Sequence, residues 1–236
     1  MKVKSDSINS LSGKVKSAWK VAAYGTVRLL IVAIVKLLWN PEIKGAENIP
    51  KKGAYLLAPS HRSFIDFALV ALLTRRRLRY MGKDSLWKYK PAGFVLSTFG
   101  AFPVKRGTPD RKAFNSSIDV LNNGEVLVMF PEGTRKTGWK IGELFDGTIY
   151  IAMKAKIPII PVGIGGSENA LPKGKWLPRR QKVVIVVGKP MWFSDEQSSL
   201  QSSSTIPRSV LKQKSEQLQN KLQELFDRAC QNSKFV

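Results

Sequence analysis

The sequence predicts an α/β fold with a mixed, largely parallel sheet flanked by helices, and three observations lead to it. Short apolar runs alternate along the chain with longer segments of helical periodicity, as strands alternate with helices in such folds. Hydrophobic residues make up 43% of the 236 residues, enough for a sizeable core, and no internal repeat is present. A separate basic and apolar segment forms the N-terminus. We therefore expect one enzyme-sized domain preceded by an N-terminal amphipathic helix.

The N-terminal segment, residues 1–40, lacks the composition of a membrane-spanning helix. No acidic residue lies between Ser7 and Pro41, and the most apolar stretch, residues 29–35, is bracketed by Arg28 and Lys36. A spanning helix needs ~20 mostly apolar residues. A span over residues 21–39 would place Arg28 near its middle, at a cost of ~3 kcal/mol. No small-residue cleavage site follows, so a signal peptide is also a poor match.

An amphipathic helix lying on an anionic membrane surface fits this segment better. Its aromatic residues at headgroup depth would be Trp19, Tyr24 and Trp39. This predicts a peripheral or monotopic protein on the cytoplasmic face of the cell membrane. The alternative is a helix that simply packs on the globular domain.

The rest of the chain divides into an α/β domain, residues 41–193, and a C-terminal part, residues 194–236. We expect strands over residues 54–58, 79–82, 126–130, 159–163 and 183–187. We expect helices over residues 64–74, 84–97, 110–122, 147–156 and 207–229. A polar linker rich in Ser and Gln, residues 194–205, precedes the last helix. The last helix carries a stripe of apolar residues that predicts packing on the domain: Leu211, Leu218, Leu222 and Leu225.

His61, the only histidine, follows the first of these strands in the string Pro59-Ser60-His61-Arg62-Ser63-Phe64-Ile65-Asp66. Imidazole moves protons near neutral pH, and a carboxylate on its second nitrogen fixes its tautomer. Five residues of helix rotate through ~500°, so the pair cannot share one helix face. His61 must therefore lie in a loop and Asp66 in the first turn of the next helix. A lone histidine with a structural role is the competing interpretation.

Three further segments follow in a fixed order. Residues 100–107 place Lys105 and Arg106 after a short apolar stretch, and the apolar run 125–130 leads directly into Pro131-Glu132-Gly133-Thr134-Arg135. Residues 157–164 form an apolar run with two prolines. Together with the His61 segment, this set resembles the four blocks of the bacterial 1-acylglycerol-3-phosphate acyltransferase family of glycerolipid acyltransferases. The resemblance covers roughly residues 61–164, with Ser60 where many members have asparagine and Pro103 interrupting the second block.

The resemblance implies that different residues around His61 contact the acceptor and the acyl group. It implies that Glu132 binds or orients the acceptor glycerol phosphate, and that the block containing Ile157, Pro158 and Pro161 shapes the acyl side. The two prolines have a competing role in fixing a strand edge.

The residues themselves suggest a phosphate clamp at the strand ends, where open α/β sheets bind ligands. Arg135 offers a planar fork of donors matched to phosphate oxygens. Lys105 and Arg106 add charge, unless they are ordinary surface cations. Gly133 allows close backbone approach, so its N–H or that of Thr134 could face the substrate.

The net charge of +22, from 39 Lys and Arg against 17 acidic residues, predicts polyanionic partners. No nucleic-acid-binding motif accompanies it, so we expect anionic lipid and phosphorylated substrates and no nucleic acid. One His and one Cys, Cys230, make a zinc site improbable, and we expect no metal and no cofactor. A nucleophile elbow is absent, because Gly165-Gly166-Ser167-Glu168-Asn169 fails at its last position.

The resemblance implies transfer of a fatty acyl group from acyl-CoA or acyl carrier protein to a hydroxyl, and without a nucleophile elbow direct transfer is the simplest mechanism. The resemblance implies 1-acylglycerol 3-phosphate as acceptor and phosphatidate as product. A different hydroxyl acceptor, such as glycerol 3-phosphate, another lysophospholipid or a glycolipid, is the alternative within enzymes. A basic nucleic-acid- or membrane-binding module with a structural His61 is the alternative from another class.

Overall fold

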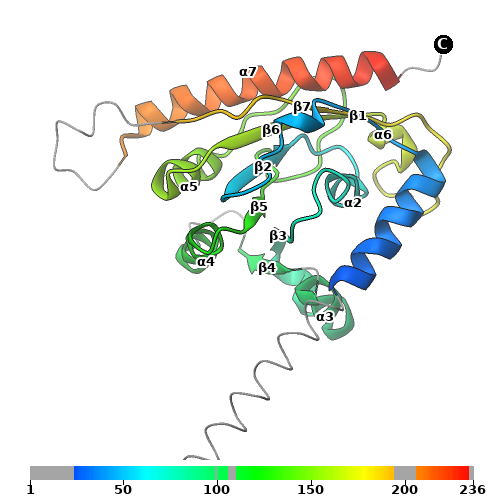
Figure 1. Cartoon of the computed structure of the whole chain (residues 1–236), viewed down its shortest axis with the longest axis horizontal. Helices are drawn as coiled ribbons and strands as arrows, with labels where there is room; N and C mark the ends of the chain where they lie inside the picture. Colours follow the sequence, from blue (N-terminus) through cyan, green and yellow to red (C-terminus); the bar gives the residue numbers. More distant parts are fainter. Residues whose placement is uncertain (1–23, 99, 106–109, 194–205, 234–236) are drawn as a thin grey trace, which may run out of the picture.

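The computed structural model describes residues 24–98, 100–105, 110–193 and 206–233, which form a seven-stranded sheet with helices on both faces (Figure 1). The strands are β1 (Glu42–Lys44), β2 (Tyr55–Pro59), β3 (Leu78–Lys83), β4 (Ala101–Val104), β5 (Val126–Val128), β6 (Ile159–Gly165) and β7 (Val184–Val187). The α-helices are α2 (Asp66–Val70), α3 (Lys90–Thr98), α4 (Arg111–Asn122), α5 (Gly147–Ala155), α6 (Ser167–Ala170) and α7 (Arg208–Ser233). Two 3-10 helices are η1 (Ala46–Asn48) and η2 (Asp84–Trp87), and residues 24–39 form an N-terminal helix.

The sheet has the strand order β1-β7-β6-β2-β5-β3-β4 and is largely parallel. Strands β2 to β6 all run in one direction. Strand β7 pairs antiparallel with β6 and parallel with β1. The predicted fold class is confirmed. Because β2 lies between β5 and β6, the loops that follow these three strands meet at one edge of the sheet.

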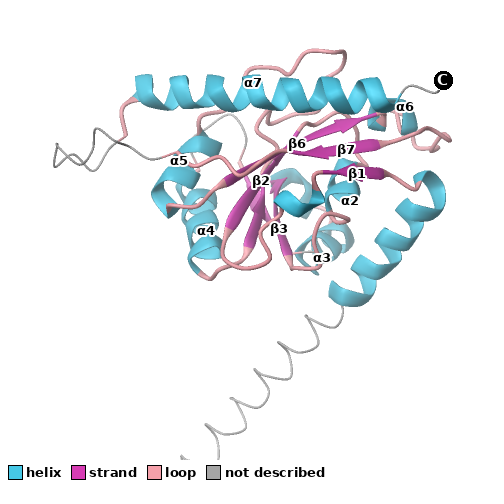
Figure 2. Ribbon diagram, turned by 45° about the horizontal axis from the view of Figure 1, so that its top comes forward, coloured by secondary structure: helices cyan, strands magenta, loops and turns pink. Residues whose placement is uncertain are grey.

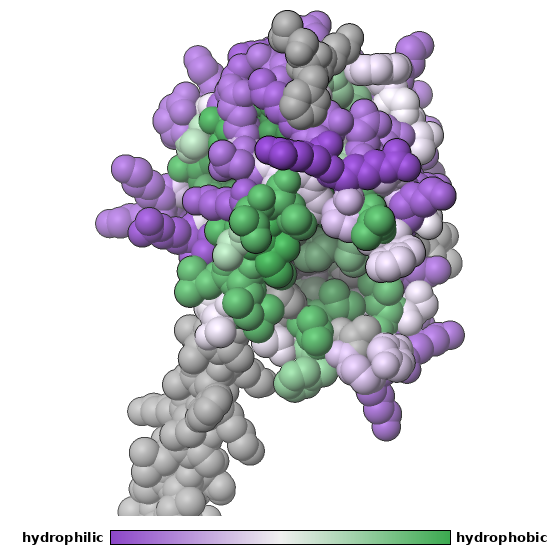
Figure 3. Space-filling model, turned by 90° about the vertical axis from the view of Figure 1, so that its right-hand side faces the viewer, coloured by the Kyte–Doolittle hydropathy of each residue, from purple (hydrophilic) through white to green (hydrophobic). Residues whose placement is uncertain are grey.

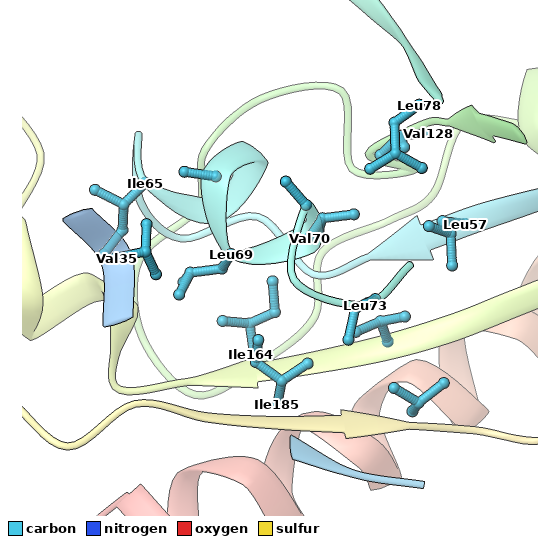
Figure 4. Packing of buried hydrophobic residues seen from close by; sticks show 14 of the residues in the cluster. Val35, Leu57, Ile65, Leu69, Val70, Leu73, Leu78, Val128, Ile164 and Ile185 are labelled. Carbon is cyan, nitrogen blue, oxygen red and sulfur yellow. The ribbon is translucent and has the colours of Figure 1, made fainter. Parts of the chain in front are cut away.

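Helices cover both faces of the sheet (Figure 2). Side chains alternate along each strand, so Tyr55 and Leu57 of β2 face one way while Leu56 and Ala58 face the other. The first pair joins a cluster with α2 and the N-terminal helix, seen in Figure 4, where Leu69 and Val70 of α2 lie between the strands and Val35. The second pair packs with α4, α5 and α7. Burial on both faces explains why the central strands are continuous apolar runs.

Helix α7 lies along β6 and β7 at very close range. Leu211, Leu218, Leu222 and Leu225 are all buried, which confirms the predicted packing stripe. A Cβ atom on Gly163 would lie 2.3 Å from the Leu225 carbonyl carbon, and one on Gly165 would lie 2.4 Å from that of Ala229. Glycine at these two alternate positions of β6 therefore lets the α7 backbone approach the sheet.

The N-terminal helix packs one side on the domain and exposes another. Arg28 donates to the Ala71 carbonyl at 2.8 Å and to that of Thr74, and the Tyr24 hydroxyl accepts from the Leu78 N–H at 3.0 Å. Apolar side chains exposed elsewhere on this helix are Leu29, Leu30, Ile34, Leu37 and Leu38. The packing alternative thus holds for one side, while Trp19 lies outside the described residues. Among the helices that the structure describes, none is long and apolar enough to cross a bilayer.

Several element bounds differ from the predicted ones. Both edge strands, β1 and β4, and the short α6 were not predicted, because three or four residues carry little periodicity. The helix predicted over residues 84–97 is divided into η2 and α3, since Pro91 in the first turn of α3 cannot continue a preceding helix. Helix α2 is shorter than predicted because its end tightens into i→i+3 hydrogen bonds at Leu72 and Leu73.

Candidate active site

His61 and Asp66 are in contact at the carboxyl end of β2. The strand ends at Pro59 and α2 begins at Asp66, so a turn separates the two side chains as predicted. The distance from His61 Nδ1 to Asp66 Oδ2 is 3.0 Å, and the same oxygen accepts from the N–H groups of Arg62 and Ser63, both at 2.7 Å. The Asp66 carboxylate is fully buried, whereas 15% of the His61 side chain is exposed. Asp66 therefore fixes one imidazole nitrogen.

The His61 ring is also held across its face. Phe130, two residues after the end of β5, stacks on it with 4.0 Å between ring centroids and 28° between planes. The loop itself is tied to β6, because Ser60 donates its N–H to Val162 and accepts from the Ile164 N–H through Oγ at 3.0 Å. The Nε2 atom has no hydrogen-bond partner among the described residues. This nitrogen is the one available to take a proton.

A buried ion pair joins the loop after β2 to the loop after β5. Arg62 Nη1 lies 3.0 Å from Glu132 Oε2, and each side chain is at most 1% exposed. The Arg62 guanidinium also donates to the Lys140 carbonyl and lies over the Phe226 ring of α7 at 4.6 Å. Arg62 was not among the predicted site residues. The sequence did not indicate that Arg62 is buried, because its partner Glu132 lies 70 positions away in the chain.

Glu132 directs its oxygens toward the protein. Oε1 accepts from the His61 N–H at 3.3 Å, and Oε2 accepts from Arg62 and from the Gly142 N–H, also at 3.3 Å. The Lys136 N–H donates to the His61 carbonyl at 2.9 Å and makes a second link between the loops. The resemblance implied that Glu132 binds or orients the acceptor. Its burial and its partners instead suit a residue that positions His61.

The prediction that the N–H of Gly133 or Thr134 faces the substrate was wrong. The Gly133 N–H donates to the Phe130 backbone carbonyl at 2.9 Å, and the Thr134 N–H donates to the Glu132 backbone carbonyl at 2.8 Å. Gly133 has φ +67°, and a Cβ there would lie 2.4 Å from the Phe145 ring. Glycine is therefore required by a left-handed turn that lies under Phe145. Thr134 itself is exposed.

Arg135 is a cation of this loop whose side chain is uncommitted. It is half-buried, and among the described residues its guanidinium has no hydrogen bond or ion pair. Lys105 is exposed beyond β4, three strands away from β2, and its N–H bonds to Asp110 at 2.9 Å. Hydrogen bonds from the N–H groups of Lys105 and then Ala113 lower the pKa of the Asp110 carboxyl. Arg106 lies outside the described residues.

The structure does not bring the predicted acyl-side residues to His61. Ile157 and Pro158 come just before β6, where the Pro158 carbonyl accepts from the Leu56 N–H near the beginning of β2. That end of the sheet is opposite to the one where His61 lies. Pro161 is buried inside β6, a central strand. Its missing N–H falls where β7 has ended, opposite Gly188.

No group of three or more His, Cys, Asp or Glu side chains that could hold a metal ion occurs in the described part of the chain. The site therefore offers three groups for chemistry: His61 with a free Nε2, the buried Asp66 carboxylate, and the uncommitted guanidinium of Arg135 in the loop after β5.

The chain is similar to known proteins in sequence and in fold. The family model described as Acyltransferase matches residues 40–165, a range that contains β1 to β6 and all the site residues above. The chain is 28% identical to a 1-acyl-sn-glycerol-3-phosphate acyltransferase of Bacillus subtilis over 195 residues, which cover 81% of this chain and 94% of that protein. It is 30% identical to one of Streptococcus pneumoniae, over 69% of this chain and 61% of that protein.

A solved structure is similar in fold. It is the crystal structure of the 1-acyl-sn-glycerophosphate (LPA) acyltransferase from Thermotoga maritima, with a TM-score of 0.63 and 21% sequence identity. The match covers 89% of this chain and 83% of that one.

Proposed function

The chain belongs to the acyltransferase family, and from that premise we propose that it transfers a fatty acyl group from a thioester to the sn-2 hydroxyl of 1-acylglycerol 3-phosphate, giving phosphatidate. The similarity to 1-acyl-sn-glycerol-3-phosphate acyltransferases of Bacillus subtilis and Streptococcus pneumoniae supports this acceptor. The observation that carries the proposal is the contact between His61 Nδ1 and the buried Asp66, which leaves Nε2 for the substrate.

In the proposed mechanism His61 acts as general base. Nε2 takes the proton of the acceptor hydroxyl as its oxygen attacks the thioester carbonyl. The tetrahedral intermediate then collapses, the carbon–sulfur bond breaks, and the thiolate recovers the proton from the imidazolium. Asp66 stabilises the imidazolium formed between these steps and keeps Nδ1 protonated in the resting state. The acyl group passes directly to the acceptor, without a cofactor and without an acyl-enzyme.

Arg135 is assigned to the acceptor phosphate. Its uncommitted guanidinium follows the same turn as Glu132, and Lys136 beside it is bonded to the His61 carbonyl. A guanidinium fork matches two phosphate oxygens. Lys105 and Arg106 remain candidates for additional charge, and Thr134 for a hydroxyl contact. Glu132 acts through Arg62 and the His61 N–H, as a positioning residue.

The acceptor is amphipathic, so the enzyme must meet it at a lipid surface. The exposed leucines of the N-terminal helix form part of a broad apolar patch that surrounds a hollow in Figure 3. Helix α3, whose Phe94 is exposed, lies near the start of that helix in Figures 1 and 2. We assign this face to the surface of an anionic membrane. The acyl donor is acyl-CoA or acyl carrier protein.

Product analysis tests the reaction. We expect purified protein, given acyl-CoA and lysophosphatidate, to form phosphatidate, and a chelator to leave the rate unchanged. Incubation with the thioester alone should leave the mass of the intact protein unchanged. Mass spectrometry of lipids and protein measures both. A stable acyl-protein adduct would contradict direct transfer, and acylation only of other lysolipids or glycolipids would contradict the acceptor.

Arg135→Lys tests the phosphate contact, because lysine keeps the charge and loses the bidentate fork. We expect kcat/KM for lysophosphatidate to fall about tenfold, the loss of one charge-assisted hydrogen bond. A monoacylglycerol of the same chain length lacks the phosphate, and its lower kcat/KM should barely change. Steady-state kinetics with both acceptors provides the comparison. Equal fold-losses for the two acceptors would mean that Arg135 has a structural role only.

A further inference from the structure

The loop between α6 and β7, residues 171–182, combines five cations with an apolar tip. Its sequence is Leu-Pro-Lys-Gly-Lys-Trp-Leu-Pro-Arg-Arg-Gln-Lys, without an acidic residue. Its cations are Lys173, Lys175, Arg179, Arg180 and Lys182. Only Lys182 has a carboxylate within 4.0 Å among the described residues, that of Glu42 at 3.5 Å. The other four cations are exposed and available to an anionic partner.

The backbone of this loop holds its apolar tip outward. The Lys175 N–H donates to the Pro172 carbonyl at 3.0 Å, and Gly174 supplies the left-handed position of this turn with φ +80°. The Arg179 N–H closes the base of the loop on the Ala170 carbonyl at 2.7 Å. At the tip, Trp176 is 87% exposed and Leu177 is 64% exposed. Trp176 is the most exposed large apolar residue in the described part of the chain.

Two hydrogen bonds connect the base of this loop to the site and to the N-terminal helix. Trp39 Nε1 donates to the Arg179 carbonyl at 2.9 Å, at the end of the helix where Leu37 and Leu38 are exposed. Ser63 Oγ donates to the Leu171 carbonyl at 2.7 Å, and Ser63 also donates its N–H to Asp66. In Figure 1 the loop, coloured yellow, lies beside the upper end of the blue helix. The loop is therefore continuous with the exposed apolar patch and directly tied to the catalytic turn.

We propose that residues 171–182 are a second membrane-binding element, in which Trp176 and Leu177 insert at headgroup depth while Lys173, Lys175, Arg179 and Arg180 contact anionic lipid. Tryptophan is favoured at the membrane interface because its ring is apolar and its N–H remains hydrated. Cations around an apolar tip match the negative potential of an anionic leaflet. The inference rests on the proposed function insofar as that function requires a lipid surface.

The consequence for catalysis is orientation. One contact at the N-terminal helix lets the domain rotate about it, whereas two contacts joined through Trp39 and Ser63 fix the face that carries His61 toward the lipid. A long-chain acceptor could then reach His61 Nε2 while most of its acyl chain stays in the bilayer. An acceptor dissolved in water does not need this orientation.

The test is vesicle flotation of the full chain together with kinetics. The loop variant carries Trp176→Ser and Leu177→Ser; a helix variant carries Leu29→Ser and Leu37→Ser. Trp192→Ser is the matched control, because Trp192 is 68% exposed and follows Met191, which pairs with Ile159 at the opposite end of β6. Vesicles contain phosphatidylcholine with or without phosphatidylglycerol. Rates are measured with lysophosphatidate in vesicles and with a short-chain acceptor dissolved below its micelle concentration.

We expect the loop variant to bind anionic vesicles about tenfold more weakly, the loss of two inserted side chains. Its rate should fall with the acceptor in vesicles and stay unchanged with the dissolved acceptor, while the control matches wild type in every measurement. A fourfold charge variant with Gln at residues 173, 175, 179 and 180 should lose binding only on vesicles with phosphatidylglycerol.

Unchanged vesicle binding by the loop variant would overturn the proposal, as would an equal loss of rate with the dissolved acceptor. If the loop variant binds vesicles normally and only its KM for an acyl carrier protein donor rises, the loop contacts a protein partner and the proposal is wrong. If wild type itself fails to bind vesicles or to acylate the dissolved acceptor, the proposed function fails. If only the helix variant loses binding, the proposed function stands and the loop proposal is wrong.

Discussion

Replacing His61 with alanine is expected to lower the rate of acyl transfer by about 10²–10⁴-fold, the usual contribution of a general base. The fold should persist, because among the described residues the His61 side chain makes one hydrogen bond, to Asp66, and one ring contact, with Phe130, and its backbone hydrogen bonds do not depend on the imidazole. The KM for the acceptor should change little, since the lost interaction acts on the transferred proton. Turnover by the purified variant, with circular dichroism to establish folding, measures the effect.

Asp66→Asn is the informative companion to this variant. Asparagine keeps the size of Asp66 and an acceptor oxygen for the N–H groups of Arg62 and Ser63, but it cannot stabilise an imidazolium. Turnover should fall by less than for His61→Ala, and the double variant should be no slower than His61→Ala alone, because the two residues act as one unit. Near-normal turnover in a folded His61→Ala protein would remove the base mechanism.

The contact between His61 and Asp66 could be predicted because it is local. Five positions separate the two residues, so a strand, a turn and a helix start were enough to deduce the geometry. The burial stripe of α7 was predictable for the same reason. Contacts between segments that are distant in the sequence could not be predicted. The pairing of Arg62 with Glu132 depends on β2 and β5 being neighbours in the sheet, and strand order is not written in any one segment.

The errors around the Glu-Gly-Thr-Arg turn have a related cause. Sequence alone indicated that Gly133 frees the backbone for close approach, but not which group approaches. In the structure that group is the Phe145 ring, and the N–H groups nearby are used within the turn. The acyl-side role that the resemblance implies for Ile157 and Pro158 stays a prediction, but the structure separates these residues from His61. A strand of seven residues separates its two ends by ~20 Å, so only the carboxyl end of β6 reaches the site.

Breaking the pair between Arg62 and Glu132 is the second change with a large expected effect. Glu132→Gln leaves the Arg62 guanidinium buried without a counter-charge, and removal of one partner from a buried pair typically costs about 3–5 kcal/mol. Glutamine can still accept the His61 N–H through Oε1. We therefore expect a large loss in the free energy of unfolding, measured by urea denaturation, with much of it recovered in a double variant that also carries Arg62→Met.

The double variant separates positioning of His61 from contact with substrate. Its core no longer contains an unpaired charge, yet the tie between the loops after β2 and β5 is reduced to the Lys136–His61 hydrogen bond and the contact through residue 132. If Glu132 positions the base, kcat should stay low while the KM for lysophosphatidate remains near that of wild type. If Glu132 instead bound the acceptor, KM would rise with every substitution at this position, whatever the stability. The split between kcat and KM therefore decides whether the buried pair serves the catalytic base or the acceptor, because stability alone would change in both cases.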